Sequence, residues 1–420
     1  MTVVVGTSSV RSGGMRELSP SQRRGWTVGA IGAGIVLLLV IIGLAWPDSD
    51  EPWQRAGPTI TVSGWIAYWQ VDAGIASFDA HRDLFADVSI MAYAARDGGS
   101  ITPFDGLPSY AVDQLTRSAA DGGVDSLATI FDQMAAGGMA ALLADPAQRS
   151  QHVADILAIV DGGGFDGVDL DYEQFAFADA RSTWATTQPN WVAFLTELAA
   201  QLHQRGKVLV VSVPPIYDDG SPTDTGAWVY DYAAMGRIVD RIRVMAYDYS
   251  VGEPGPIAPI EWVRSLVDAI TDLVPPSKVD LGIPVYGRDW PVSTEGVCPT
   301  DHEPATESIT TDAATALLAS RSLTPVLDAD AAEMRADYTD VVTGVDATGA
   351  ATACTVQRTL WYLDAAAIQA RAQLAWRHDL HGVVLWALGN DNAATWSALV
   401  DARLGLEPGE TLAPSTVSSP

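Results

Sequence analysis

Short apolar runs recur along the chain, and helix-like segments separate them. The runs cover residues 64–69, 88–93, 124–131, 165–173, 208–214, 242–247, 279–286 and 383–388. The first seven begin roughly 25 to 45 residues apart, the spacing of a strand followed by a crossover helix, which requires a parallel sheet. Eight such runs predict an α/β fold, a closed (β/α)₈ TIM barrel over residues 59–405.

Two helices in this pattern carry end signals. The first places apolar residues at helical spacing over residues 191–202, with Asn190 before them and Gly206 after them. This arrangement predicts an N-cap at Asn190 and a left-handed C′ residue at Gly206. The second helix is expected to begin at Asp364 and to end near residues 381–382.

The seventh and eighth runs are separated by roughly 100 residues, far more than one crossover helix needs. Residues 289–360 mix turn-forming residues with short β-branched segments. We therefore expect a small inserted subdomain between strands 7 and 8, beside the mouth of the barrel.

The N-terminal segment predicts a membrane helix. Residues 26–46 are uncharged and mostly apolar, matching the ~20 residues that span a bilayer. Arginines precede the segment within residues 1–25, acidic residues follow it in a linker at residues 47–58, and Trp lies at both ends, as in interfacial aromatic belts. We expect a single-pass anchor in the lipid bilayer, with residues 1–25 in the cytoplasm and everything after the helix outside the cell.

A cleaved signal peptide is the alternative to this anchor, because Gly43 and Ala45 offer small residues at a plausible cleavage site. In either case the rest of the chain meets an oxidising exterior. Cys298 and Cys354 are then expected to form a structural disulfide. At the other end, residues 406–420 are rich in Pro, Ser and Thr and predict a disordered tail.

Charge argues against one class of partner. The formal net charge is −28, from 52 acidic and 24 basic side chains. A phosphate backbone would be repelled over most of such a surface, so nucleic acid is not an expected partner.

One strand carries three acidic residues at alternate positions. Because side chains alternate along a strand, Asp169, Asp171 and Glu173 share one face, while apolar residues occupy the other. In a barrel whose outer face packs on helices, the acidic face must point into the interior. Like charges crowded there cannot all stay ionised, so at least one proton is retained. Glu173 is nearest the C-terminal mouth and is the expected proton donor.

Two other interpretations of this strand exist. An Asp-x-Asp-x-Glu triplet could hold calcium or magnesium, or could form an acidic surface strand. The barrel context and the apolar alternation favour catalysis over both.

The acidic pattern Asp166-Gly-Val-Asp169-Leu-Asp171-Tyr-Glu173 resembles the signature of glycoside hydrolase family 18, the chitinase-like enzymes. Met245-Ala-Tyr247-Asp248 resembles the Met-x-Tyr-Asp motif of that family, and Trp386 resembles the tryptophan beneath its cleavage subsite. The segments at residues 282–290 and 385–389 look most like the branch with spore-germination and cortex-lytic enzymes.

This resemblance implies a retaining, substrate-assisted mechanism. Glu173 would protonate the glycosidic oxygen, and Asp171 would orient the 2-acetamido group of the substrate, which attacks the anomeric carbon. Asp169 would share a proton with Asp171. Tyr247 would bind the acetamido carbonyl, and Asp248 would tune the acid or bind sugar hydroxyls.

The third strand departs from the family. Many chitinases carry Ser-x-Gly-Gly there, whereas this chain has Ser126-Leu-Ala128-Thr129. The departure argues against crystalline chitin. The expected substrate is therefore a β-1,4-linked glycan that contains N-acetylglucosamine, either chitin oligomers or peptidoglycan.

Further candidates for substrate binding are Met245 and four aromatic residues near strand ends, where side chains can reach the mouth and stack on sugars. The aromatic residues are Tyr68, Tyr93, Tyr286 and Trp290. For each aromatic residue, core packing is an equally good interpretation.

Two other functions compete with hydrolysis by this route. One is a non-catalytic, chitinase-like glycan-binding protein, which would keep the pocket without the chemistry. The other is a metal-dependent hydrolase, which the absence of His near the acidic residues disfavours. The expected mechanism needs no cofactor and no metal.

Overall fold

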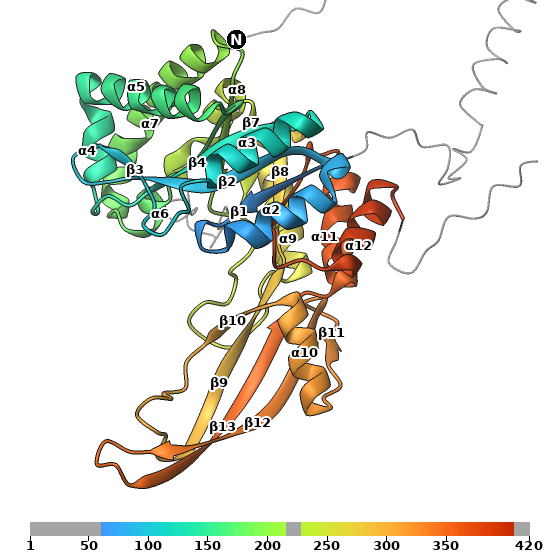
Figure 1. Ribbon diagram of the computed structural model, residues 1–420. Helices are drawn as coiled ribbons and strands as arrows, with labels where there is room; N and C mark the ends of the chain where they lie inside the picture. Colours follow the sequence, from blue (N-terminus) through green and yellow to red (C-terminus); the bar gives the residue numbers. More distant parts are fainter. Residues whose placement is uncertain (1–59, 216–227, 407–420) are drawn as a thin grey trace, which may run out of the picture. The chain divides into compact units, whose positions relative to one another are not determined.

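A computed structural model describes residues 60–215 and 228–406 of the chain (Figure 1). The predicted cytoplasmic segment, membrane helix and linker lie outside these ranges, as does the C-terminal tail after Leu406. Within the described ranges, no helix is both long enough and apolar enough to cross a membrane. The anchor at residues 26–46 therefore stays a prediction.

Eight parallel strands form a closed barrel, as the spacing of the apolar runs predicts. The strands, labelled as in Figure 1, are β1 (Thr61–Ile66), β2 (Phe85–Ala95), β4 (Asp125–Asp132), β5 (Gly167–Asp171), β6 (Val208–Val213), β7 (Arg241–Val244), β8 (Val279–Pro284) and β14 (Gly382–Trp386). Closure follows from β1, which pairs with β2 on one side and with β14 on the other. A short strand, β3 (Ile101–Pro103), adds antiparallel to the end of β2.

Helices follow the barrel strands and bury the outer face of the sheet. They are α2 (Val71–Ala80), α3 (Ala111–Gly122), α4 (Gly138–Ala144), α5 (Pro146–Gly163), α6 (Gln174–Phe177), α7 (Trp184–His203), α8 (Tyr232–Ile238), α9 (Ile260–Thr271), α11 (Ala365–Arg377) and α12 (Ala393–Arg403). Short 3₁₀ turns occupy Tyr68–Gln70, Arg82–Leu84, Arg181–Thr183, Trp228–Tyr230 and Pro276–Lys278. One apolar core joins helices and strands, including Leu115 of α3, Ile156 of α5 and Leu170 of β5.

The predicted N-cap at Asn190 is wrong. Helix α7 begins at Trp184, so Asn190 lies inside it and its side-chain amide donates to the carbonyl of Thr186 at 3.0 Å. The apolar stripe extends back to the buried Trp184, which lengthens the helix beyond its predicted start. Gly206 does adopt the left-handed conformation, with φ +67°, and Asp364 caps α11 by accepting from the amide of Ala367.

The segment between β8 and β14 forms a second sheet of five strands. These are β9 (Tyr286–Gly296), β10 (Glu307–Thr310), β11 (Val326–Asp328), β12 (Glu333–Val345) and β13 (Ala351–Tyr362). Helix α10 (Thr311–Arg321) packs on it through a small apolar cluster that includes Leu318 and Leu360. The predicted disulfide is confirmed, because Cys298 after β9 is bonded to Cys354 in β13.

The N-terminal half of the barrel interior is filled by charged side chains. Arg241 and Arg243 of β7 are buried there with Asp87 of β2 and Asp280 of β8. Both arginines form ion pairs with both aspartates. This network lies directly below the acidic residues of β5.

Candidate active site

The alternation on β5 places the acidic residues as the sequence predicts. Val168, Leu170 and Tyr172 are fully buried in the apolar core, and the ring of Tyr172 stacks on Phe194 of α7. Asp169 and Asp171 therefore point the other way, into the barrel, and both are buried. Glu173 follows the strand at the start of α6, at the C-terminal mouth.

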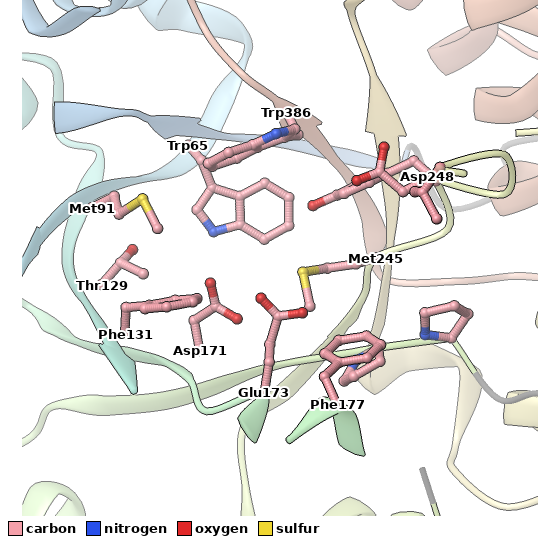
Figure 2. A pocket seen from close by; sticks show the side chains of 14 residues that line it. Trp65, Met91, Thr129, Phe131, Asp171, Glu173, Phe177, Met245, Asp248 and Trp386 are labelled. Carbon is pink, nitrogen blue, oxygen red and sulfur yellow. The ribbon is translucent and has the colours of Figure 1, made fainter. Parts of the chain in front are cut away.

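A pocket of about 310 Å³ opens above this face. Its lining comes from the ends of several barrel strands and the loops that follow them: Trp65, Met91, Thr129, Phe131, Asp171, Glu173, Phe177, Pro214, Pro215, Met245, Tyr247, Asp248, Val251 and Trp386. Figure 2 shows the carboxyl groups of Asp171 and Glu173 side by side, directed toward the rings of Trp65 and Trp386. The pocket thus combines an acidic pair with an aromatic wall.

The side chains of Asp171 and Glu173 are hydrogen-bonded to each other, which requires a proton on one of the two carboxyl groups. Burial raises the pKa of Asp171 well above its usual value, and the charges of Glu173 and Asp169 raise it further. Burial and the charge of Asp248 raise the pKa of Glu173 to about 7. Asp171 Oδ1 is buried and has no hydrogen-bond partner among the described residues. The pair can therefore donate a proton near neutral pH.

Three donors from other strands contact the carboxylate of Asp169. Its Oδ2 accepts from the indole N–H of Trp65 at 2.7 Å and from the guanidinium of Arg243 at 2.6 Å. Its Oδ1 accepts from the hydroxyl of Ser212 at 2.7 Å. The charge of Asp169 also raises the pKa of Asp171, and the expected sharing of a proton between these two residues stays a prediction.

The loop after β7 supplies the opposite wall. Met245, Tyr247 and Asp248 all line the pocket. Burial raises the pKa of Tyr247 well above its usual value, so its hydroxyl stays protonated and can donate. Asp248 accepts from the hydroxyl of Tyr286 and, at 2.7 Å, from Arg288. Tyr286 is not part of the pocket lining, and it contacts the site through Asp248.

Two tryptophans from neighbouring strands form the aromatic wall. Trp65 of β1 is directly opposite Trp386 of β14 in the strand register. Their rings meet edge to face, with centroids 5.9 Å apart. Trp386 is partly exposed on the pocket side, so a sugar ring can stack on it.

Like Tyr286, the three other aromatic candidates near strand ends do not line the pocket. Tyr68 stacks on Phe104 with ring centroids 4.3 Å apart. Trp290 is buried in the inserted sheet against Ala331 and Trp361. Tyr93 packs on the outer side of the barrel, in contact with Phe165.

A β-bulge explains the position of Tyr93. Met91 pairs with Thr129 and Tyr93 pairs with the next residue, Ile130, so Ala92 is an extra residue in β2. An extra residue reverses the alternation of the side chains that follow it. Met91 and Thr129 therefore face the pocket, whereas Tyr93 and Ile130 face the helices.

The sequence patterns did not single out several residues that line the pocket or lie beneath it. Trp65 lies within the first apolar run, and its alternation with Gly64 and Ile66 could have placed it inside the barrel. Arg243 could have been found because Arg241 and Arg243 alternate with the apolar Ile242 and Val244, which turns both arginines inward. Phe177, in the short helix after Glu173, carries no comparable periodic signal.

Within residues 60–215 and 228–406, no group of three or more His, Cys, Asp or Glu side chains has an arrangement suited to a metal ion.

The sequence from residue 90 to residue 391 matches glycosyl hydrolases family 18. The chain belongs to this family. The match contains the acidic strand, the loop after β7 and Trp386, whereas Trp65 of the pocket lies before it. The chain is therefore a member of a chitinase-like family of glycosidases.

Relatives of the chain include bacterial cell-wall enzymes. A Bacillus subtilis protein named as a sporulation-specific glycosylase, YdhD, is 31% identical over 284 residues, which cover 63% of each chain. A cortical fragment-lytic enzyme of the same organism is 26% identical over 265 residues, covering 62% of this chain and 55% of the relative. The chain thus spans less than two thirds of the length of both relatives.

Solved structures show the same fold. A class V chitinase from Pseudomonas fluorescens Pf-5 superposes with a TM-score of 0.66 at 26% identity, covering 82% of this chain and 99% of that one. The Bacillus cereus spore cortex-lytic enzyme SleL gives a TM-score of 0.66 at 19% identity, over 83% of this chain and 75% of that one. At 19% identity, the similarity to SleL shows only that the two chains share a fold.

Proposed function

We propose that this family 18 glycosidase cleaves β-1,4 linkages in glycans that contain N-acetylglucosamine, with retention of configuration and with Glu173 as general acid and base. The observation that carries the proposal is the Asp171–Glu173 pair. It holds a proton with a pKa of about 7 on Glu173, at the mouth of a pocket with an aromatic wall.

Glu173 is positioned to act on the leaving oxygen. Its carboxyl group points into the pocket from the C-terminal end of the barrel (Figure 2). A general acid works best when its pKa lies near the working pH. Burial and the nearby charge of Asp248 bring Glu173 into that range.

Asp171 and Tyr247 suit the 2-acetamido group of the substrate. The carboxyl group of Asp171 lines the pocket and can accept from the amide N–H, and the hydroxyl of Tyr247 can donate to the carbonyl oxygen. These two contacts would turn the carbonyl toward the anomeric carbon, as substrate-assisted hydrolysis requires. Trp386 would support the sugar ring from the other side.

The substrate is either peptidoglycan or chitin oligomers. The names of the B. subtilis relatives describe a sporulation-specific glycosylase and a cortical fragment-lytic enzyme, which favours a cell-wall glycan. We place the catalytic barrel outside the cell, because the N-terminal apolar segment predicts export. The disulfide fits an oxidising compartment.

The test is product analysis by mass spectrometry, with purified peptidoglycan and chitin oligomers as separate substrates. The wild-type chain should release fragments with a new N-acetylglucosamine reducing end. Glu173→Gln should lose at least 100-fold in rate, the usual contribution of a general acid or base, and should still bind the oligomer by calorimetry. Binding without any fragment release by the wild-type chain would instead identify a glycan-binding protein.

Asp132 offers a matched control. Burial raises its pKa to about 6, yet it does not line the pocket. Asp132→Asn should therefore retain activity. Equal losses of activity in the Asp132 and Glu173 variants would contradict the assignment of Glu173 as the catalytic acid, because Asp132 does not line the pocket.

A further inference from the structure

The edge of the pocket beyond Glu173 carries two strongly exposed apolar side chains. Phe177 in α6 is 63% exposed, and Val251 in the loop after β7 is 65% exposed. Both line the pocket, together with Pro214 and Pro215 after β6. Single exposed apolar side chains are ordinary on protein surfaces, whereas a group of them along one pocket is typical of a binding surface. These four residues are named the apolar rim below.

Hydrogen bonds fix the two segments that carry the exposed side chains. Helix α6 follows Glu173 directly, and its other phenylalanine, Phe175, is fully buried in the apolar core. The backbone amide of Phe177 donates to the carbonyl of Glu173 at 3.2 Å. In the other segment, the carbonyl of the residue before Val251 accepts from Arg288 at 2.5 Å. Both segments therefore present an apolar side chain to the pocket from a fixed backbone.

The proposed mechanism places the leaving group beside this rim. Asp171 would bind the acetamido group of the sugar that is attacked, and Glu173 would protonate the oxygen that leaves. Figure 2 shows Asp171 and Phe177 on opposite sides of Glu173. Because the leaving oxygen joins the two parts of the substrate, the part beyond it extends away from Asp171 and toward Phe177.

The rim offers a bound group mainly apolar surface. Asp248 also lies on this side of Glu173 in Figure 2, and its Oδ1 already accepts from Arg288 at 2.7 Å. The C–H groups on the faces of a sugar ring pack on aromatic and aliphatic side chains as other apolar surface does. A site that binds through such contacts discriminates weakly between groups that have and lack a particular hydroxyl.

We infer that Phe177 and Val251 are specificity-determining residues, which bind the leaving group by apolar contact and do not recognise its pattern of hydroxyl groups. The inference rests on the proposed hydrolytic function. The exposure of both side chains leaves space for a substituent on a leaving sugar, such as the 3-O-lactyl ether that distinguishes N-acetylmuramic acid from N-acetylglucosamine. The rim therefore suits the leaving sugars of peptidoglycan and of chitin oligomers, and also a flat aryl group.

The first test compares three substrates that differ only in the leaving group. Each carries two N-acetylglucosamine units, followed by fluoride, by 4-methylumbelliferone or by a third N-acetylglucosamine. Fluoride is a single atom and cannot reach the rim. Phe177→Ala should therefore lose about 10-fold in kcat/KM with the two large leaving groups, the effect of one lost stacking contact, and should match the wild type with fluoride. Phe177→Tyr, which keeps the ring, should restore the wild-type values, and Val251→Ala should show a smaller loss of the same kind.

The outcomes separate this inference from the proposed function. Equal losses by Phe177→Ala on all three substrates would overturn the inference, because they would connect Phe177 with the chemistry at Glu173 rather than with the leaving group. Wild-type values of kcat/KM on all three would overturn it as well. If the wild-type chain hydrolyses none of the three substrates, the proposed function fails, and the inference fails with it.

Trp69→Ala is the matched control. Trp69 is 60% exposed, and its ring meets that of Trp386 edge to face, with centroids 6.0 Å apart. Figure 2 shows Trp386 across the pocket from Phe177. The variant should change kcat/KM by the same factor with all three leaving groups. A loss confined to the two large leaving groups would contradict the specific role of Phe177.

The second test changes the leaving sugar. In the trisaccharide, N-acetylmuramic acid replaces the third N-acetylglucosamine, with its lactyl carboxyl group as a methylamide so that no charge is added. The wild-type chain should cleave both trisaccharides with values of kcat/KM within about 100-fold of each other, the range of apolar discrimination. A site that hydrogen-bonds a hydroxyl rejects the analogue that lacks it by on the order of 10⁴-fold. A loss larger than about 100-fold would therefore overturn the inference.

Discussion

Replacing Glu173 by Gln should change stability as well as activity, and the change should depend on pH. Burial raises the pKa of Glu173 from 4.5 to about 7 in the folded chain. Between these two pH values the unfolded chain releases its proton while the folded chain keeps it. The free energy of unfolding therefore falls as pH rises through this window. Below about pH 4.5 both states are protonated, and above about pH 7 both are ionised.

The size of the effect follows from the shift. One pKa unit corresponds to about 1.4 kcal/mol, so ionised Glu173 costs the folded state on the order of 3 kcal/mol above pH 7. Gln does not titrate, so the variant avoids this cost. Unfolding entropy of about 2 cal/mol/K per residue over about 350 residues converts 3 kcal/mol into about 4 °C.

The assay is differential scanning calorimetry of both proteins at pH 5 and pH 8. The advantage of Glu173→Gln in melting temperature should be about 4 °C larger at pH 8 than at pH 5, while hydrolysis is lost at both. Glu261→Gln is the control, since Glu261 is 71% exposed and should show no such dependence. An equal difference in melting temperature at the two pH values would refute the raised pKa of Glu173, and with it the argument for the proton donor.

Three further results are expected. Tyr247→Phe should lower kcat by about 100-fold with little change in KM, because it removes one preorganised donor; steady-state kinetics on chitin oligomers would check this. Trp386→Ala should raise KM about 10-fold through lost stacking, and an unchanged KM would place the sugar elsewhere. Reducing the Cys298–Cys354 disulfide, which closes a sequence separation of 56 residues, should lower stability by up to about 4 kcal/mol in the chain-entropy model. Activity in the barrel should survive reduction when assayed below the lowered melting temperature.

The sequence alone determined the features that repeat within single elements. Eight apolar runs at crossover spacing predicted the barrel, because a parallel strand must be followed by a connection of that length. Period-two alternation placed Asp169, Asp171 and Glu173 on one face, because neighbouring side chains of a strand point to opposite sides. Both signals are local, so they can be read without knowing which strands pair.

The tertiary structure decided which partners those residues meet. Arg243 lies 74 positions from Asp169 and 154 from Ser89, and only closure of the barrel brings the three together. Tyr93 does not face the pocket, because a bulge in the pairing of β2 with β4 reverses the alternation of side chains before it. Register and closure depend on all eight strands at once, so the ion pair of Asp169 with Arg243 could not be predicted from the acidic strand alone.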